Sequence, residues 1–333
     1  MKQTAIVPQQ TNPIAITSAP VAQLVTAWRA DLDVRVHAGE LSGSTATTYA
    51  AGVEKFVSWA DGQNLAGGVT ADIIRGWMGH ERDSGARPGS VNTWLAGVRS
   101  LMGWAVERGQ LQTNPTANLK GVSRRGTSKR HKRESLTNDE VRRLLAIPDA
   151  STNDGARDAA IVALMVYTGA RTIELHRADV DDVRTMDGNL CLAVRGKGRA
   201  EADEVVVIAH PDAVNAVHNW LAIRRQLAGK DGPLFCSLSN RTRGQRLSLS
   251  FIRRAVMDYM KSAGIVGAGS TKSTHSLRHT AITNAIRHGA PITQVQAMAR
   301  HANLATTSVY VHEVSRMDNP AESFIRYDDN GVR

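Results

Sequence analysis

A basic segment without apolar periodicity divides the chain into two patterned parts and therefore limits how it can fold. We predict that residues 111–135 form a linker, because they contain Asn114-Pro115 and little apolar sequence. The cations of this segment are Arg124, Arg125, Lys129, Arg130, Lys132 and Arg133. A run of charges is usually just solvated. Because this one lies between two domains of a basic protein, we favour contact with a phosphate backbone.

The first part of the chain, residues 18–110, has apolar residues at helical spacing and predicts a small all-helical bundle. The apolar faces of its four predicted helices contain Leu24, Val25, Trp28 and Leu32, then Tyr49, Val53, Phe56, Val57 and Ala60, then Ile73, Ile74, Trp77 and Met78, then Val91, Trp94, Leu95, Val98, Met102 and Ala105. Ser18, Thr70 and Ser90 are the predicted N-caps, and Gly109 is expected after the fourth helix. Five of the six tryptophans lie here, so we expect them to pack in the core rather than stack on bases.

Residues 136–333 are predicted to form a mainly α domain with a small antiparallel β-sheet and a C-terminal tail. A capping box at Thr137 begins one helix, and a second is expected from about Arg157 to Thr168, where Gly169 stops it. Alternating apolar residues in 190–194 and the apolar run 205–208 flank a Gly-Lys-Gly turn and predict a hairpin. Further helices are expected from Pro211 and after Ser248, Thr274 and Pro291.

Charge and composition bound the function classes. At 333 residues the chain can hold two domains, and its net charge of +10 favours a polyanionic partner such as nucleic acid, with a solvated basic surface as the alternative. Cys191 and Cys236 are far apart, which argues against a disulfide framework. Residues 1–17 lack periodicity and read as a flexible tail without the apolar core of a signal peptide. The longest apolar run, 159–167, is too short to span a bilayer, so we expect a cytoplasmic protein.

His275, Arg278 and His279 would share one face of a helix that begins near Thr274 or Ser276. An exposed basic face and a site with three convergent polar groups are equally consistent with this spacing. A zinc site is disfavoured, because the two-histidine helix of a metalloprotease has Glu after the first His, where this chain has Ser276. No metal or other cofactor is expected.

Taken together, the ordered motifs of the second part resemble the tyrosine recombinase (phage integrase) family. Thr168-Gly169-Ala170-Arg171-x-x-Glu174-Leu175 resembles its first arginine box, and His275-x-x-Arg278-His279 resembles the second. Thr307-x-x-Tyr310-x-His312 resembles the nucleophile box, with His301 before it and Lys197 in the hairpin turn. The match covers about residues 136–315, and the helical part before it is similar in size to the family's SAM-like core-binding domain. One departure is Ala299-Arg300 before His301, where the family usually has Leu-Gly.

The resemblance implies a role for each motif residue in cleaving a phosphodiester. Tyr310 would attack the phosphorus, and Arg171 and Arg278 would stabilise the charge that develops on its oxygens, which arginine can do bidentately. His279 would accept the tyrosine proton and Lys197 would protonate the leaving oxygen. The remaining roles are phosphate binding by His275 and His301 and support of the arginines by Glu174. Alternative structural roles are a solvated turn for Lys197, a helix C-cap for His301, a surface acid for Glu174 and core packing for Tyr310.

The function that this resemblance implies is site-specific DNA recombination through a 3′-phosphotyrosine and a Holliday junction. The expected partners are double-stranded DNA with inverted-repeat core sites and a homotetramer assembled on it, without a membrane. Integration, resolution and movement of a mobile element remain open as biological roles. A type IB topoisomerase and a non-catalytic DNA-binding regulator of the same fold are the alternatives.

Overall fold

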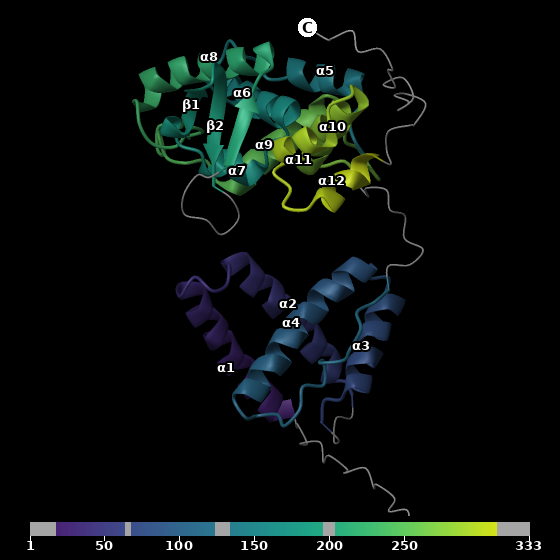
Figure 1. Ribbon diagram of the computed structural model, residues 1–333. Helices are drawn as coiled ribbons and strands as arrows, with labels where there is room; N and C mark the ends of the chain where they lie inside the picture. Colours follow the sequence, from purple (N-terminus) through teal and green to yellow (C-terminus); the bar gives the residue numbers. More distant parts are fainter. Residues whose placement is uncertain (1–17, 64–67, 124–133, 196–203, 312–333) are drawn as a thin grey trace, which may run out of the picture. The chain divides into compact units, whose positions relative to one another are not determined.

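The computed structural model describes residues 18–63, 68–123, 134–195 and 204–311 (Figure 1). The chain divides into two compact units, Met1–Thr127 and Ser128–Arg333. The first part of the expected linker, residues 111–123, packs on the first unit: Leu119 is 5% exposed in its core, and Asn92 bonds both backbone groups of Val122. Residues 111–123 therefore belong to the first unit and not to the linker that the sequence predicted. The six cations of that linker lie in residues 124–133, outside the described residues.

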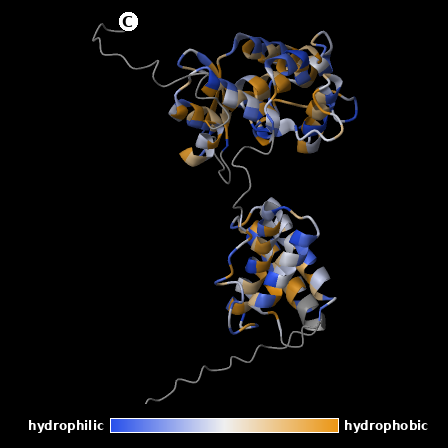
Figure 2. Ribbon diagram, turned by 90° about the vertical axis from the view of Figure 1, so that its right-hand side faces the viewer, coloured by the Kyte–Doolittle hydropathy of each residue, from blue (hydrophilic) through white to orange (hydrophobic). Residues whose placement is uncertain are grey.

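The described part of the first unit contains four helices, α1 Ser18–His37, α2 Gly43–Ala60, α3 Ala71–Asp83 and α4 Pro88–Glu107. Figure 2 shows hydrophobic and hydrophilic residues sharing these helices, as the periodicity predicted. Trp28, Trp77 and Trp104 are buried, which confirms their packing role. Thr70 caps α3 through the backbone N–H of Ile73. The predicted cap Ser90 is wrong, because α4 begins two residues earlier with a proline in its first turn.

Helices α2 and α4 cross at two glycines that allow their backbones to touch. A Cβ added to Gly52 would lie 2.7 Å from the Trp94 Cα, and one added to Gly97 would lie 2.9 Å from the Tyr49 Cα. Both would also overlap a backbone carbonyl oxygen of the other helix. Real Cβ atoms do not approach backbone so closely, so the crossing requires glycine at both positions.

We therefore expect Gly97→Ala to destabilise the first unit by about 3 kcal/mol, because the backbones must separate. The melting temperature should fall by about 10 °C or more, measured by tryptophan fluorescence during thermal unfolding. Gly79→Ala is the matched control, because this helical glycine has nothing within 4 Å of an added Cβ. Equal stability of the two variants would mean that the helices are not in backbone contact.

The second unit has the predicted fold class, mainly helical with one small antiparallel sheet. In chain order the described residues form α5 Asn138–Ala146, α6 Asn153–Thr168, α7 Thr172–Arg177, a 3-10 turn Val180–Asp182, β1 Val183–Met186, β2 Asn189–Val194, β3 Glu204–Ile208, α8 Pro211–Ala228, α9 Leu249–Ser262, α10 Thr274–Arg287, α11 Ile292–Ala299 and α12 Leu304–Val311. The sheet order is β1-β2-β3, and both pairs are antiparallel. The predicted hairpin is thus β2 and β3, while β1 was not predicted. The sheet lies at one end of the unit and α10–α12 at the other (Figure 1).

Helix α6 forms the centre of the second unit and is buried along almost its whole length. It begins at Asn153, four residues before the predicted start, because Thr152 caps it through the backbone N–H of Gly155. Arg157 lies inside the helix, 3% exposed, with its Nε 2.8 Å from Asp158 Oδ1. The predicted capping box at Thr137 on α5 is confirmed.

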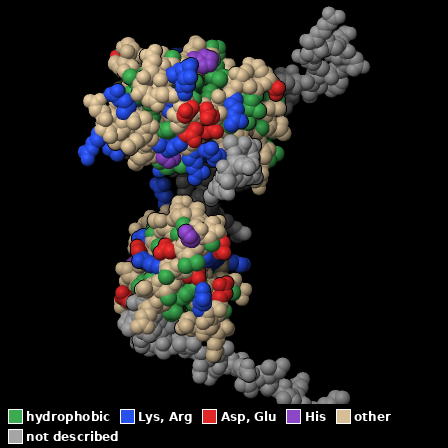
Figure 3. Space-filling model, turned by 90° about the vertical axis from the view of Figure 1, so that its left-hand side faces the viewer, with side chains coloured by type: hydrophobic (Ala, Val, Ile, Leu, Met, Phe, Trp, Pro, Cys, Tyr) green, Lys and Arg blue, Asp and Glu red, His purple; other side chains and the backbone are tan. Residues whose placement is uncertain are grey.

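None of the described helices is long and apolar enough to cross a membrane. Cys191 and Cys236 are both buried, and burial raises the pKa of each thiol. Figure 3 shows one face of the second unit on which acidic side chains gather in one group with Lys and Arg side chains around it. Acidic and basic side chains therefore lie close together on this face.

Candidate functional site

The end of helix α6 places Arg171 at the start of α7. Gly169 ends α6 with φ 63 and ψ 24, the left-handed conformation that glycine adopts without strain. The Arg171 guanidinium donates from Nη1 to Glu174 Oε1 over 2.7 Å. Its Nη2 donates to the carbonyls of Ala299 and Arg300, at 3.1 and 3.0 Å. The side chain is 35% exposed, so it retains surface that a ligand can contact.

Helix α10 buries Arg278 against the same backbone. Arg278 is 8% exposed and donates from Nη1 to the Gly169 carbonyl over 2.7 Å and from Nη2 to the Ala299 carbonyl. Burial lowers its pKa to about 10, and the positive charges of Arg171 and Arg300 act in the same direction. The guanidinium is therefore charged at neutral pH. Because both predicted arginines bond the end of α11, two segments about a hundred residues apart in sequence meet at one point.

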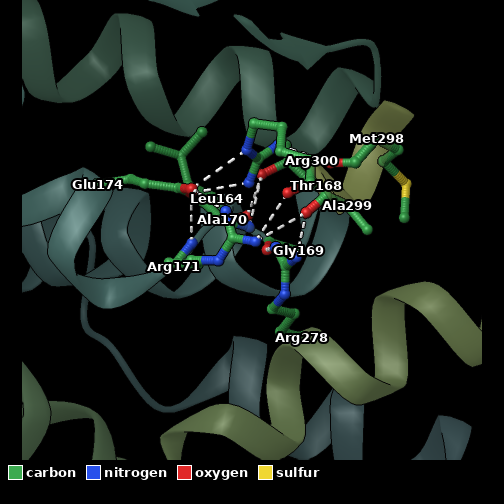
Figure 4. A network of polar contacts seen from close by, with 10 residues as sticks. All are labelled: Leu164, Thr168, Gly169, Ala170, Arg171, Glu174, Arg278, Met298, Ala299 and Arg300. Atoms are coloured by element: carbon green, nitrogen blue, oxygen red, sulfur yellow. Dashed lines mark hydrogen bonds and ion pairs between the residues drawn. The ribbon is translucent and has the colours of Figure 1, made fainter. Parts of the chain in front are cut away.

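A third arginine, Arg300, joins this cluster from the end of α11 (Figure 4). Its Nε and Nη2 donate to the two oxygens of Glu174, at 3.1 and 2.7 Å, and its Nη1 donates to the Met298 carbonyl at 2.6 Å. The side chain is 3% exposed. The residue has φ 50 and ψ 50, a conformation that costs a residue with a Cβ about 1–2 kcal/mol.

Sequence reasoning gave Arg300 no role. The only signal was that an arginine stands where the resembling family usually has glycine. The structure shows that Arg300 adopts a left-handed backbone, which glycine would adopt without strain, and forms a buried ion pair with Glu174.

Glu174 is the carboxylate that Arg171 and Arg300 share. It is 6% exposed, so the alternative of a surface acid is wrong. Burial raises its pKa, but Arg300, Arg171 and the backbone N–H of Arg171 outweigh burial and hold the pKa below its usual 4.5. A folded-state pKa below the unfolded value gives stability that is complete above pH 4.5 and is lost as the pH falls through the folded value.

We therefore expect the second unit to lose stability in acid partly through Glu174. The free energies of unfolding of the unaltered protein and of Glu174→Gln should differ most above pH 4.5 and approach each other below it. Urea unfolding at a series of pH values between 7 and 3 measures this difference. A difference that stays constant over the series would contradict the assignment.

Helix α12 carries Tyr310 into a small apolar cluster, where it is 3% exposed. The ring centroid of His279 lies 5.3 Å from that of Tyr310, and the centroid of His301 lies 6.3 Å from it. The phenol is also close enough to Arg278 to raise the pKa of that arginine slightly against the larger lowering effects. The buried residues packed with the ring are Ile282, Val295 and Ala299.

The C-cap of α11 is Arg300, so the alternative of His301 as the cap is wrong. His301 follows the cap, and its backbone N–H donates to the Gln296 carbonyl over 3.2 Å. Its Nδ1 lies 2.9 Å from the hydroxyl of Thr307, a fully buried residue for which the sequence suggested no contact. His275 lies in the first turn of α10 and is exposed. Lys197 lies in residues 196–203, outside the described residues. Glu204, the first residue of β3, lines an open pocket together with Arg300 and His301.

The described residues thus bring together the predicted Arg171, Glu174, Arg278, His279, His301 and Tyr310. In the part of the chain that the structure describes, no group of three or more His, Cys, Asp or Glu side chains could hold a metal ion. What this arrangement offers is guanidinium and imidazole groups beside one phenol.

Comparison with known proteins agrees with this arrangement. Residues 134–316 match the model of the phage integrase family. The chain belongs to this family of tyrosine recombinases. It is 32% identical over 262 residues to a tyrosine recombinase XerC of Mycobacterium bovis (strain BCG / Pasteur 1173P2), covering 77% of this chain and 83% of that protein. It is 29% identical to the XerC of Thermodesulfovibrio yellowstonii, covering 81% of this chain and 86% of the relative.

Solved structures share the fold of this recombinase. The XerH site-specific recombinase bound to a palindromic difH substrate has a TM-score of 0.66 and 18% identity, with 92% of this chain and 84% of that chain covered. A lambda integrase tetramer bound to a Holliday junction has a TM-score of 0.63 and 18% identity, with 90% and 78% covered. At these identities the likeness shows the fold.

Proposed function

We propose that this recombinase cuts and rejoins DNA strands through a covalent bond between Tyr310 and the 3′ phosphate of the cut strand. The observation that carries the proposal is the convergence of Arg171 and Arg278 on the end of α11, beside the ring of Tyr310. Two guanidiniums held by carbonyls and a carboxylate are fixed before a substrate binds. Preorganised cations of this kind stabilise the charge that builds up on a phosphate under attack.

The proposed step forms one bond and breaks one. The Tyr310 oxygen attacks phosphorus while its proton passes to His279, whose ring is adjacent to the phenol. The 5′ oxygen leaves with the bonding electron pair and takes a proton from Lys197. His275 and His301 contact the phosphate oxygens, and Glu174 orients Arg171.

The proposed substrate is double-stranded DNA with an inverted-repeat core site, bound by a homotetramer that passes through a Holliday junction. The net charge of +10 favours such a partner. Proteins of this fold are known bound to a difH substrate and, as a tetramer, to a Holliday junction. We assign core-site binding to the helical unit over 18–110 and to the cations of 124–133, and catalysis to 136–333. Within this class, integration, resolution and movement of a mobile element are all compatible with the site.

Trapping the covalent intermediate tests this function. The substrate is a duplex that the full chain selects from a random-sequence DNA pool. A nick beside the cleavage position lets the short strand end diffuse away, so the cut strand cannot be religated. We expect a protein–DNA adduct that survives denaturing electrophoresis, with the nucleotide mapped to Tyr310 by peptide mass spectrometry. An adduct with relaxation of a plasmid that lacks the site would point to a topoisomerase. Binding without an adduct would refute the catalytic proposal.

A further inference from the structure

The end of helix α11 holds both predicted clamp arginines through its backbone. The Ala299 carbonyl accepts a hydrogen bond from Arg171 and another from Arg278, and the Arg300 carbonyl accepts a second one from Arg171. These carbonyls lie at the C-terminal end of a helix of eight residues. The position of this helix end therefore fixes the position of the two guanidiniums.

The Arg300 side chain fastens that helix end to α7. Two of its nitrogens meet the two oxygens of Glu174, and the third bonds the carbonyl of Met298 in its own helix. Glu174 in turn accepts from the backbone and the side chain of Arg171. The contacts close a ring that runs from Arg171 through Glu174 and Arg300 and returns through the α11 carbonyls (Figure 4). A glycine would suit the left-handed backbone but could not close the ring.

We propose that Arg300 is a positioning residue for DNA cleavage, which sets the Arg171 and Arg278 guanidiniums by tying the end of α11 to Glu174. The inference rests on the proposed function, because it assigns the two arginines to the scissile phosphate. Arg300 itself is almost fully buried and has all three guanidinium nitrogens bonded within the protein. It acts through its neighbours.

The test compares Arg300→Gly with the unaltered protein in single-turnover cleavage of the selected, nicked duplex at saturating protein. We expect the rate constant of adduct formation to fall by about 10- to 100-fold, the usual effect of removing a residue that orients a site. DNA affinity should change less than about threefold, because the Arg300 side chain is only 3% exposed. Arg300→Lys should give an intermediate rate, since an ammonium keeps the charge but cannot make the two-point contact.

Three further measurements separate positioning from a general effect on folding. Asp187→Gly is the matched control, because Asp187 also has a positive φ, 48, but lies in the turn between β1 and β2; its rate should be unchanged. A purely structural role for Arg300 would lower the fraction of active protein, read as burst amplitude, and leave the rate constant intact. In the Glu174→Gln background, Arg300→Gly should lower the cleavage rate constant by less than about threefold, because the ring of contacts is already broken.

A rate constant for Arg300→Gly within threefold of the unaltered protein would overturn the inference while leaving the Tyr310 adduct in place. If Arg300→Gly lowers the cleavage rate constant in the Glu174→Gln background as much as in the otherwise unaltered protein, Arg300 does not act through Glu174. Absence of any Tyr310 adduct in the unaltered protein would instead overturn the proposed function, and the inference with it.

Discussion

Tyr310→Phe is expected to abolish the covalent protein–DNA adduct while leaving the fold and DNA binding in place. The aromatic ring is 3% exposed and packs with Ile282, Val295 and Ala299. Phenylalanine keeps these contacts, so the free energy of unfolding should change by no more than about 1.5 kcal/mol, the worth of one hydrogen bond. Only the oxygen that would attack phosphorus is lost. Denaturing electrophoresis of the nicked duplex and a native binding titration measure the two effects.

Tyr167→Phe is the control for loss of a phenol in the same unit. Its hydroxyl donates over 3.0 Å to Asp212 on α8, a helix that contributes no residue to the arginine cluster, so this variant should form the adduct at the normal rate. An adduct that persists in Tyr310→Phe would assign the nucleophile to another residue.

Arg278→Lys is expected to slow adduct formation by about 10²- to 10³-fold, the range measured when one preorganised donor to a developing charge is removed. The arginine bonds two separate carbonyls, those of Gly169 and Ala299, which a lysine cannot do with the same geometry. Burial and the nearby positive charges lower the pKa of Arg278 to about 10 and leave it charged. The same surroundings would lower the pKa of a lysine from its ordinary value of about 10.4 toward neutral pH. Part of the positive charge would therefore be lost as well.

The matched control is Arg287→Lys, an exposed arginine in the last turn of the same helix, for which a change of less than about threefold is expected. Single-turnover rates at saturating protein compare the two variants. Near-normal cleavage by Arg278→Lys would mean that Arg278 does not bind the reacting phosphate.

Much of the fold could be predicted because local signals and burial coincide. The helical spacing of apolar residues gave the four helices of the first unit, and Thr70 and Thr137 cap where the sequence placed them. The start of α6 was missed because Arg157 looked like a polar boundary, whereas its charge is paired inside the unit with Asp158. Strand β1 was missed because its residues Val183–Met186 are mostly exposed and show no apolar alternation.

The part of the site that could be predicted is the part whose residues belong to the ordered motifs. Arg171 and Arg278 meet at the end of α11, as a site built from both boxes requires. The function of Arg300 could not be predicted, because its pairing with Glu174 joins residues 126 positions apart and follows from tertiary packing. The overlap of α2 and α4 at Gly52 and Gly97 has the same origin, since no local pattern distinguishes these glycines from others in helices.

The sharing of Glu174 by two arginines has a consequence for charge neutrality in the proposed reaction. Three guanidiniums and one carboxylate leave the described part of the cluster, histidines aside, with two uncompensated positive charges. A bound phosphodiester cancels one of them. Attack passes the Tyr310 proton to His279 and brings a second negative charge to the phosphorus centre, so the second uncompensated guanidinium charge is matched only as the new bond forms. The electrostatic match is therefore to the transition state rather than to the bound DNA, which is the condition for speeding the chemical step instead of only tightening binding.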